Sequence, residues 1–142
     1  MALIPHAGAM CLLDSVHQWD SLSITCVTSS HRDANNPLAS GGRLDSLCGI
    51  EYAAQAMAIH GGLTSGRRSE AGYLASVRGV VCTTGRLDQL RGDLEVTGTL
   101  LAADTTGAIY DFRLRSSEKT ILSGRAAVVL DDSRLSRAAP RI

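Results

Sequence analysis

The sequence predicts an α+β fold in which a curved antiparallel sheet is wrapped around one long central helix. Residues 44–61 have helical composition and end at a Gly-Gly pair, a common helix terminator. Before and after this segment, apolar and polar residues alternate with the period of two that half-buried strands require. Because the helix is slim and largely apolar, the economical arrangement turns the apolar faces of the strands toward it.

Length and composition are those of one domain. The chain has 142 residues, of which 44% are hydrophobic, enough for a single packed core. We assign residues 1–131 to this domain and expect residues 132–142 to form a flexible C-terminal tail. The 14 basic and 14 acidic residues balance, and like charges are not grouped. Nucleic acid is therefore not an expected partner.

The N-terminus lacks the basic region and unbroken apolar run of a signal peptide, and no later apolar run has membrane-spanning length. We expect a cytoplasmic protein without membrane insertion. The cysteines are scattered and lack metal-ligand spacing, which predicts reduced thiols and no metal site. Among them, Cys48 stands near the helix start, where the helix dipole could lower a thiol pKa. Without an adjacent base, a packing role is favoured for it. The four are Cys11, Cys26, Cys48 and Cys82.

The first elements are two strands over residues 10–16 and 22–28, joined by a turn at 19–21. In the second strand we expect Leu22, Ile24 and Cys26 to face inward. Turn-forming residues then fill 29–42 and predict a loop that contains His31.

The helix over residues 44–61 begins at a cap supplied by Asp45 or Ser46 and spans roughly 25 Å. Alanines at 53 and 56 keep it slim. Its buried stripe is predicted to consist of Leu47, Ile50, Ala54, Met57, Ala58 and Gly61.

After the helix, residues 63–72 read as a loop, and four strands follow. The two hairpin turns among them lie at 104–107 and 116–119. A sheet of this kind leaves exposed edges, so we expect two copies to pair edge to edge as a dimer. The strands are predicted at 73–82, 94–103, 108–116 and 120–130.

Glu51 is the residue that packing does not explain. It borders the predicted buried stripe, and no basic residue lies three or four positions away on the helix. Such a carboxyl group either finds distant partners or has a raised pKa that lets it hold a proton near neutrality. The alternative, a glutamate that extends to water, is less favoured because the sheet covers most of the helix.

Among the four histidines, His31 is the candidate base. It follows the second strand and opens the loop that returns to the helix, so its ring could lie over Glu51 of the same or a partner chain. An imidazole base and a carboxylic acid on opposite sides of one substrate would suit proton removal coupled to loss of a hydroxyl group.

Three motifs together resemble the hot-dog-fold 3-hydroxyacyl-acyl-carrier-protein dehydratases, most closely the divergent dehydratase-like proteins of aryl polyene pathways. Ile-Pro-His at 4–6 with Met-Cys-Leu-Leu-Asp-Ser-Val at 10–16 is similar to their first strand. Leu-Cys-Gly-Ile-Glu-Tyr-Ala-Ala-Gln at 47–55 resembles their helix, in which Gln follows an acid by four residues. Leu-Arg-Gly-Asp-Leu at 90–94 resembles their Pro-Gly-Asp turn.

The resemblance implies syn-type removal of water from a 3-hydroxyacyl thioester on the phosphopantetheine arm of an acyl carrier protein, without a metal or redox cofactor. In that reaction His31 would take the α-proton, and Glu51, oriented by Gln55, would protonate the departing hydroxyl group. Backbone N–H groups near Leu47 and Cys48 would hold the thioester oxygen. The partners implied are the carrier protein and a second hot-dog subunit, identical or different.

The sequence also leaves open functions other than catalysis of dehydration. The family's His-Phe-Pro-Gly segment before the helix is replaced here by Asn-Asn-Pro-Leu at 35–38, and His31 lies farther from Glu51 than is usual. The chain could therefore be a hot-dog subunit with weak or no activity that pairs with an active paralogue. Acyl thioester hydrolysis and simple carrier binding are the other possibilities. In each case four arginines could contact an acidic carrier: Arg67, Arg68, Arg78 and Arg91.

Overall fold

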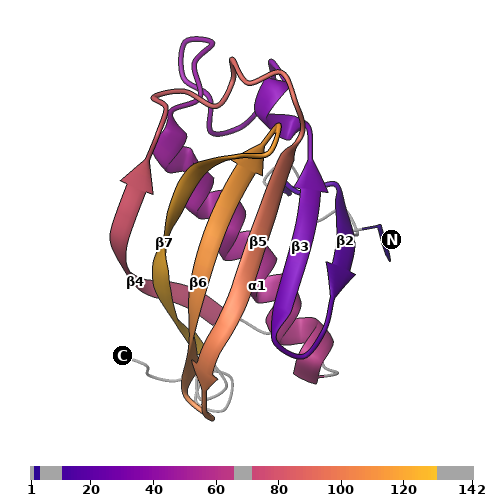
Figure 1. The fold of residues 1–142 in the computed structure, drawn as a ribbon, viewed down its shortest axis with the longest axis vertical. Coiled ribbons are helices and arrows are strands. Elements are labelled where there is room, and N and C mark those ends of the chain that lie inside the picture. Colours follow the sequence, from indigo (N-terminus) through magenta and orange to yellow (C-terminus); the bar gives the residue numbers. More distant parts are fainter. Residues whose placement is uncertain (1, 4–10, 66–71, 131–142) are drawn as a thin grey trace.

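A computed structural model describes residues 2–3, 11–65 and 72–130, in which a single sheet wraps around one helix (Figure 1). The sheet has seven strands in the order β1-β2-β3-β5-β6-β7-β4, and every neighbouring pair is antiparallel. The predicted α+β class and the antiparallel sheet around one long helix are thus confirmed. The strands are β1 (Ala2–Leu3), β2 (Ser15–Trp19), β3 (Ser23–Thr28), β4 (Gly72–Cys82), β5 (Leu94–Ala103), β6 (Gly107–Ser116) and β7 (Lys119–Leu130).

The helix begins and ends later than predicted. A 3-10 turn, η2 (Ser46–Cys48), precedes α1 (Gly49–Ser65), so regular helix starts at Gly49. Asp45 holds the N-cap position as expected, but its side chain makes no capping hydrogen bond. The Gly61-Gly62 pair does not end the helix, because glycine adopts helical torsions without obstruction and the Thr64 hydroxyl hydrogen-bonds the His60 carbonyl one turn back.

The predicted buried stripe was only partly confirmed: Met57 is buried and Ile50 packs against the core, while Ala54 and Gly61 are half-buried. Leu47 is 54% exposed and Ala58 is exposed, whereas Tyr52 and His60 are fully buried. Polar aromatic residues can occupy this face because their polar atoms have partners. The residues of α1 that are buried are Gly49, Tyr52, Ala53, Ala56, Met57 and His60.

Two hydrogen-bond clusters satisfy these buried side chains. The Tyr52 hydroxyl lies 2.9 Å from both the Ser30 hydroxyl and the Asn36 side-chain nitrogen. His60 Nδ1 lies 2.7 Å from the Tyr110 hydroxyl, and its Nε2 lies 2.8 Å from the Asp20 carbonyl. Together they attach both halves of α1 to the surrounding strands and loops.

The first hairpin differs from the prediction in its first strand and at its turn. The first strand was predicted at 10–16, whereas β2 begins only at Ser15 and continues to Trp19. Ile24 and Cys26 are fully buried in β3, but Leu22 is 59% exposed. Leu22 belongs to the turn, in which the Asp20 carboxylate accepts hydrogen bonds from the N–H groups of Leu22 and Ser23, both at 2.9 Å. Hydrogen bonds from these N–H groups to the aspartate stabilise the turn. Leu22 therefore stays in the turn, although its side chain would also suit a strand.

The β6–β7 hairpin turn contains two non-glycine residues with positive φ, Ser117 at 51° and Glu118 at 68°. Such left-handed conformations cost most residues about 1–2 kcal/mol, and glycine avoids that cost. Glu118→Gly is expected to raise the free energy of unfolding by about 0.5–1 kcal/mol, as measured by urea denaturation. The control is Lys119→Gly, which places glycine in β7 and should destabilise; equal effects of the two changes would contradict the explanation.

Strand β4 forms one edge of the sheet (Figure 1). Its pairing with β7 is interrupted by a bulge between Arg78 and Val81, where Gly79 has a φ of 65°. Val81 is 58% exposed beside this edge. Within the described part of the chain, no helix combines the length and the apolar character needed to cross a membrane.

Candidate functional site

Glu51 lies in the first turn of α1 and is half-buried. The helix start is held firmly against the sheet: a Cβ placed on Gly49 would lie 2.7 Å from Leu122 Cδ2 and 2.8 Å from Leu114 Cδ2. Only glycine permits so close an approach of the helix backbone to β6 and β7. The position of Glu51 relative to the sheet is therefore fixed two residues earlier by Gly49.

Gln55 is the side-chain partner of Glu51, and the structure brings the two together as the helix spacing implied. Gln55 Oε1 accepts a hydrogen bond from the Leu12 N–H at 2.9 Å, and Gln55 Nε2 lies 3.5 Å from Glu51 Oε2. Because an N–H donor fixes which end of the amide faces Leu12, the NH₂ group must face the carboxyl group. Gln55 thus links Glu51 to the segment before β2.

Leu12 was not predicted to take part in this arrangement, because it acts through its backbone and not through its side chain. Its carbonyl accepts hydrogen bonds from the Thr28 hydroxyl at 2.7 Å and the Ser30 hydroxyl at 2.6 Å. Ser30 in turn lies beside the hydroxyl of Tyr52, the neighbour of Glu51 on the helix. The Leu12 backbone therefore connects Gln55, the end of β3 and α1 in one continuous network.

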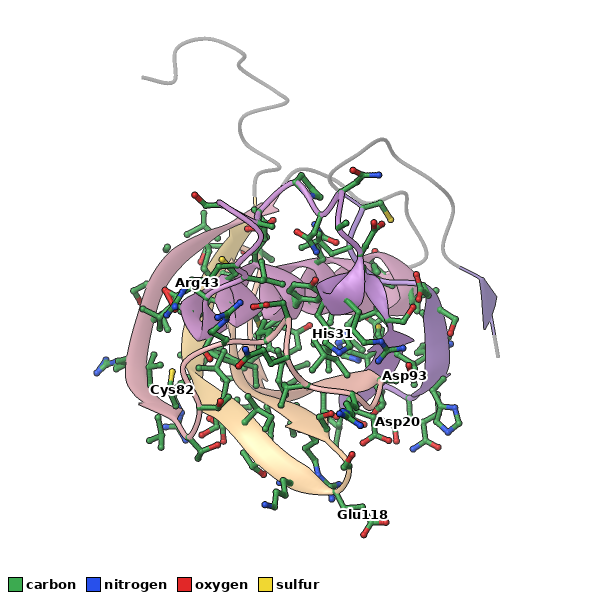
Figure 2. All side chains as sticks on the ribbon, turned by 90° about the horizontal axis from the view of Figure 1, so that it is seen from above. Asp20, His31, Arg43, Cys82, Asp93 and Glu118 are labelled. Atoms are coloured by element: carbon green, nitrogen blue, oxygen red, sulfur yellow. The ribbon has the colours of Figure 1, made fainter. Side chains whose placement is uncertain are left out.

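His31 lies in a short 3-10 helix, η1 (Ser30–Arg32), and is 1% exposed. Its Nε2 lies 2.9 Å from the Gly92 carbonyl and 3.2 Å from the Leu90 carbonyl, so Nε2 carries the hydrogen and donates it. Nδ1 is buried without a partner. Figure 2 shows His31 inside the molecule, on the side of Asp93. The structure shows no hydrogen bond between His31 and Glu51, and the base role of His31 stays a prediction.

Burial lowers the pKa of His31 below its usual value of 6.5, and the neighbouring charge of Arg32 lowers it further. The unfolded chain therefore binds a proton first as the pH falls, and the stability that neutral His31 contributes is present above pH 6.5 and lost below it. We expect the free energy of unfolding to decline from pH 7.5 to pH 5.5. His31→Gln, which keeps a donor but cannot titrate, should show a smaller decline in denaturation series; parallel curves would contradict this assignment.

Among the described residues, the other histidines form no hydrogen bond with Glu51. Both ring nitrogens of His60 are engaged, with Tyr110 and with the Asp20 carbonyl. His17 is exposed on β2. His6 lies outside the described residues. Within residues 11–65 and 72–130, the only hydrogen-bond partner of Glu51 is thus Gln55, and no histidine is hydrogen-bonded to it.

Leu47 and Cys48, the expected backbone donors, belong to η2. The Cys48 N–H already donates to the Asp45 carbonyl at 3.0 Å, so binding of a thioester oxygen there would have to replace that bond. The helix dipole does not lower the pKa of the Cys48 thiol: burial, with the Asp45 charge as a lesser cause, raises it, which agrees with the packing role favoured for this residue. All four cysteines are free thiols, and burial raises the pKa of Cys26 to about 12.

The site therefore consists of one half-buried carboxyl group with an amide oriented toward it, on a rigid helix start. Such a group can donate or accept one proton at a fixed position. No cluster of three or more potential metal-ligating side chains occurs in residues 2–3, 11–65 and 72–130.

Comparisons with known proteins agree with this architecture. The dehydratase heterocomplex ApeI:P from Xenorhabdus doucetiae superposes with a TM-score of 0.81 at 23% identity, covering 97% of this chain and 95% of that one. A thioesterase from Pseudomonas aeruginosa gives 0.59 at 14% identity, with 82% and 79% covered. Thioesterase superfamily member 2 from zebra fish gives 0.60 at 15% identity, with 82% and 80% covered. These likenesses confirm the hot-dog fold.

No curated protein sequence matches the chain. The model of the ApeP-like family, described as ApeP dehydratase, matches residues 1–138, which is nearly the whole sequence. That match includes the helix with Glu51 and Gln55 and supports a dehydratase role. It also confirms the resemblance drawn from the motifs at 47–55 and 90–94. The chain belongs to the ApeP-like dehydratase family.

Proposed function

We propose that this chain takes part in the dehydration of a 3-hydroxyacyl thioester, carried on the phosphopantetheine arm of an acyl carrier protein, to the trans-2-enoyl thioester. The observation that carries the proposal is the half-buried Glu51, held by an oriented Gln55 at a rigid helix start, in a member of a dehydratase family. The reaction would serve cytoplasmic assembly of fatty acid or polyene chains.

In this reaction a base removes a proton from C2, the electron pair forms the C2–C3 double bond, and the C–O bond at C3 breaks. Glu51 in its acid form donates a proton to the departing hydroxyl group, which leaves as water. Gln55 keeps the carboxyl group pointed at that oxygen. Backbone N–H groups at the helix start would stabilise the developing charge on the thioester oxygen.

We further propose that the base comes from a second, different hot-dog subunit. The rings of His31 and His60 are buried, and their Nε2 atoms are bound to backbone carbonyls. For His31 to act, its unpartnered Nδ1, which is buried, would have to become accessible to the substrate. The similar structure from Xenorhabdus doucetiae is itself a dehydratase heterocomplex, which supports a shared site with Glu51 from this chain. A wholly structural role is the corresponding alternative.

The edge of β4 is the surface we assign to subunit pairing. Val80 and Val81 are exposed there. The unpaired backbone groups of an edge strand can form hydrogen bonds with a strand of another subunit. Val81→Lys should weaken association with the partner by about tenfold or more, because a charge at an edge opposes strand pairing. Sedimentation measures this association. The control is Ile109→Lys. Ile109 is 40% exposed but lies on the internal strand β6, so this change should leave assembly intact.

The function is tested with the purified chain alone, a co-encoded hot-dog partner alone, and their mixture, each given a 3-hydroxyacyl-carrier thioester. We expect full formation of the enoyl thioester only in the mixture, with loss of activity when Glu51 is changed to Gln. Full activity in the mixture after that change would leave only a structural role.

Thioester hydrolysis is separated by assaying free thiol in the same mixtures. The likeness to thioesterases extends to the fold alone. Release of thiol without the enoyl product would contradict dehydration. Carrier contact by arginines also stays a prediction: Arg78 and Arg91 are exposed, whereas Arg67 and Arg68 lie outside the described residues.

A further inference from the structure

The face of the sheet turned away from α1 carries an open groove of about 740 Å³ across β4, β5, β6 and β7. Figure 1 looks onto this face, with α1 behind the strands. Side chains alternate along β6: Phe112 is buried on the helix side, whereas Asp111 and Arg113 lie on the groove side. The groove is therefore separated by the sheet from the helix that carries Glu51.

Positive charge is in excess in the groove. Its lining contains three arginines and one aspartate. Arg125 uses Nε and Nη2 to bind the Asp111 carboxylate at 2.8 and 3.4 Å, which neutralises that pair. Arg78 and Arg113 make no hydrogen bond or ion pair with any described residue. Two uncompensated guanidinium groups thus line one concavity.

Hydroxyl groups and a rigid floor complete the surroundings of these arginines. Thr99 and Ser123 line the groove, and Thr97 does so with its hydroxyl 3.2 Å from that of Thr25 on β3. On β5, β6 and β7 the strands are paired residue by residue, with Thr97 opposite Arg113 and Arg113 opposite Ser123. Arg78 pairs with Arg125 at the start of the β4 bulge. All of these donors are therefore on strands rather than on a loop, as a preformed binding site requires.

We propose that this groove binds the phosphate group of a small phosphorylated molecule, at a site distinct from Glu51. Guanidinium groups match the geometry of phosphate oxygens with paired N–H donors, and hydroxyl groups add further donors. Asp111 does not repel the anion, because Arg125 neutralises it. The volume lies within the range of small-molecule sites, about 300–1,000 Å³. The inference does not depend on the proposed dehydration.

The phosphate has two possible sources: a free phosphate compound, or the phosphate of a phosphopantetheine arm. Titration of the ¹⁵N-labelled full chain at constant ionic strength separates them, with inorganic phosphate, 4′-phosphopantetheine and pantetheine as probes. We expect saturable shifts of backbone amides at 97–99, 111–113 and 123–125 with both phosphates and none with pantetheine. Tighter binding of phosphopantetheine than of inorganic phosphate assigns the site to the arm, and equal binding assigns it to a free phosphate compound.

Variants test the two arginines individually. Arg113→Gln and Arg78→Gln should each weaken phosphate binding by about tenfold, while Arg113→Lys, which keeps the charge without the paired donors, should fall between Gln and wild type. Arg43→Gln is the control, because Arg43 is exposed and lies outside the groove. The wild-type shifts do not depend on any variant folding correctly.

Three results would overturn the proposal. They are the absence of saturable shifts with either phosphate, equal affinity in Arg113→Gln and wild type, and the same shifts with pantetheine as with phosphopantetheine. Shifts at these amides with a carrier protein lacking its arm, but with neither phosphate, would identify the groove as a protein-docking surface and would also reject it.

Discussion

Glu51→Gln is expected to lower kcat for dehydration by about 10²–10⁴-fold in the assembled complex, the usual contribution of general acid catalysis. Glutamine has nearly the same shape but no acidic proton for the departing hydroxyl group. Stability should change little, because the hydrogen bond that this carboxyl group accepts from Gln55, the single one it makes with described residues, is long, at 3.5 Å. Steady-state kinetics with a carrier-bound substrate measures the loss, and thermal unfolding verifies the fold.

Glu95→Gln is the matched control for this change. Glu95 is exposed on β5, and its ion pair with Arg115 is long, at 3.9 Å. Such pairs contribute little, so both kcat and stability should stay close to those of the wild type. A loss of kcat in Glu51→Gln that is no larger than the loss in Glu95→Gln would remove Glu51 from the mechanism.

Leu122→Ala should lower the free energy of unfolding by about 2–5 kcal/mol, the range for truncating a buried leucine. Leu122 is 0% exposed on β7 and packs directly against the backbone of Gly49. The cavity left by its methyl groups would lie under the helix start and would loosen the support of Glu51. Urea denaturation gives the stability, and kcat of the same variant reports on the site.

Leu22→Ala is the comparison for that experiment. Leu22 is 59% exposed in the first hairpin turn and loses little burial on truncation. Its effect on unfolding should be within about 0.5 kcal/mol. If the two leucines had equal effects, the packing of Gly49 against Leu122 would not be an important contact of the core.

The positions of the last three strands were predictable because half-buried strands carry their own signal. Predicted ranges and observed strands agree closely at 94–103, 108–116 and 120–130, where apolar residues alternate with charged or hydroxyl residues. Each alternation reflects one buried and one solvated face, which is a local property of the sequence. The fold class followed from these strands and from one uninterrupted helical segment.

The buried face of α1 was not predictable in the same way. Apolar residues occur around most of this helix, so periodicity does not select one side. Tyr52 and His60 define the buried face through partners at Ser30, Asn36 and Tyr110, which are distant in sequence. As a consequence, Leu47 was predicted to be buried because it is apolar, whereas it is 54% exposed.

In the candidate site, the two side chains on the helix could be predicted from the sequence, but the residues around them could not. Glu51 and Gln55 are four residues apart, so helical geometry alone places them together. The position of the His31 ring depended on the path of residues 29–42. Its Nε2 donates to the Gly92 carbonyl, 61 positions away in the sequence. Long-range contacts to backbone atoms leave no pattern in the sequence, and Leu12 was missed for the same reason.

A structure of the assembled heteromer with a 3-hydroxyacyl thioester analogue bound is the most direct test of the central claim. We predict a Glu51 carboxyl oxygen within about 2.6–3.2 Å of the oxygen on C3. We also predict an imidazole of the partner subunit on the opposite side, facing C2. Binding of the analogue away from Glu51, or an imidazole of this chain facing C2, would contradict it.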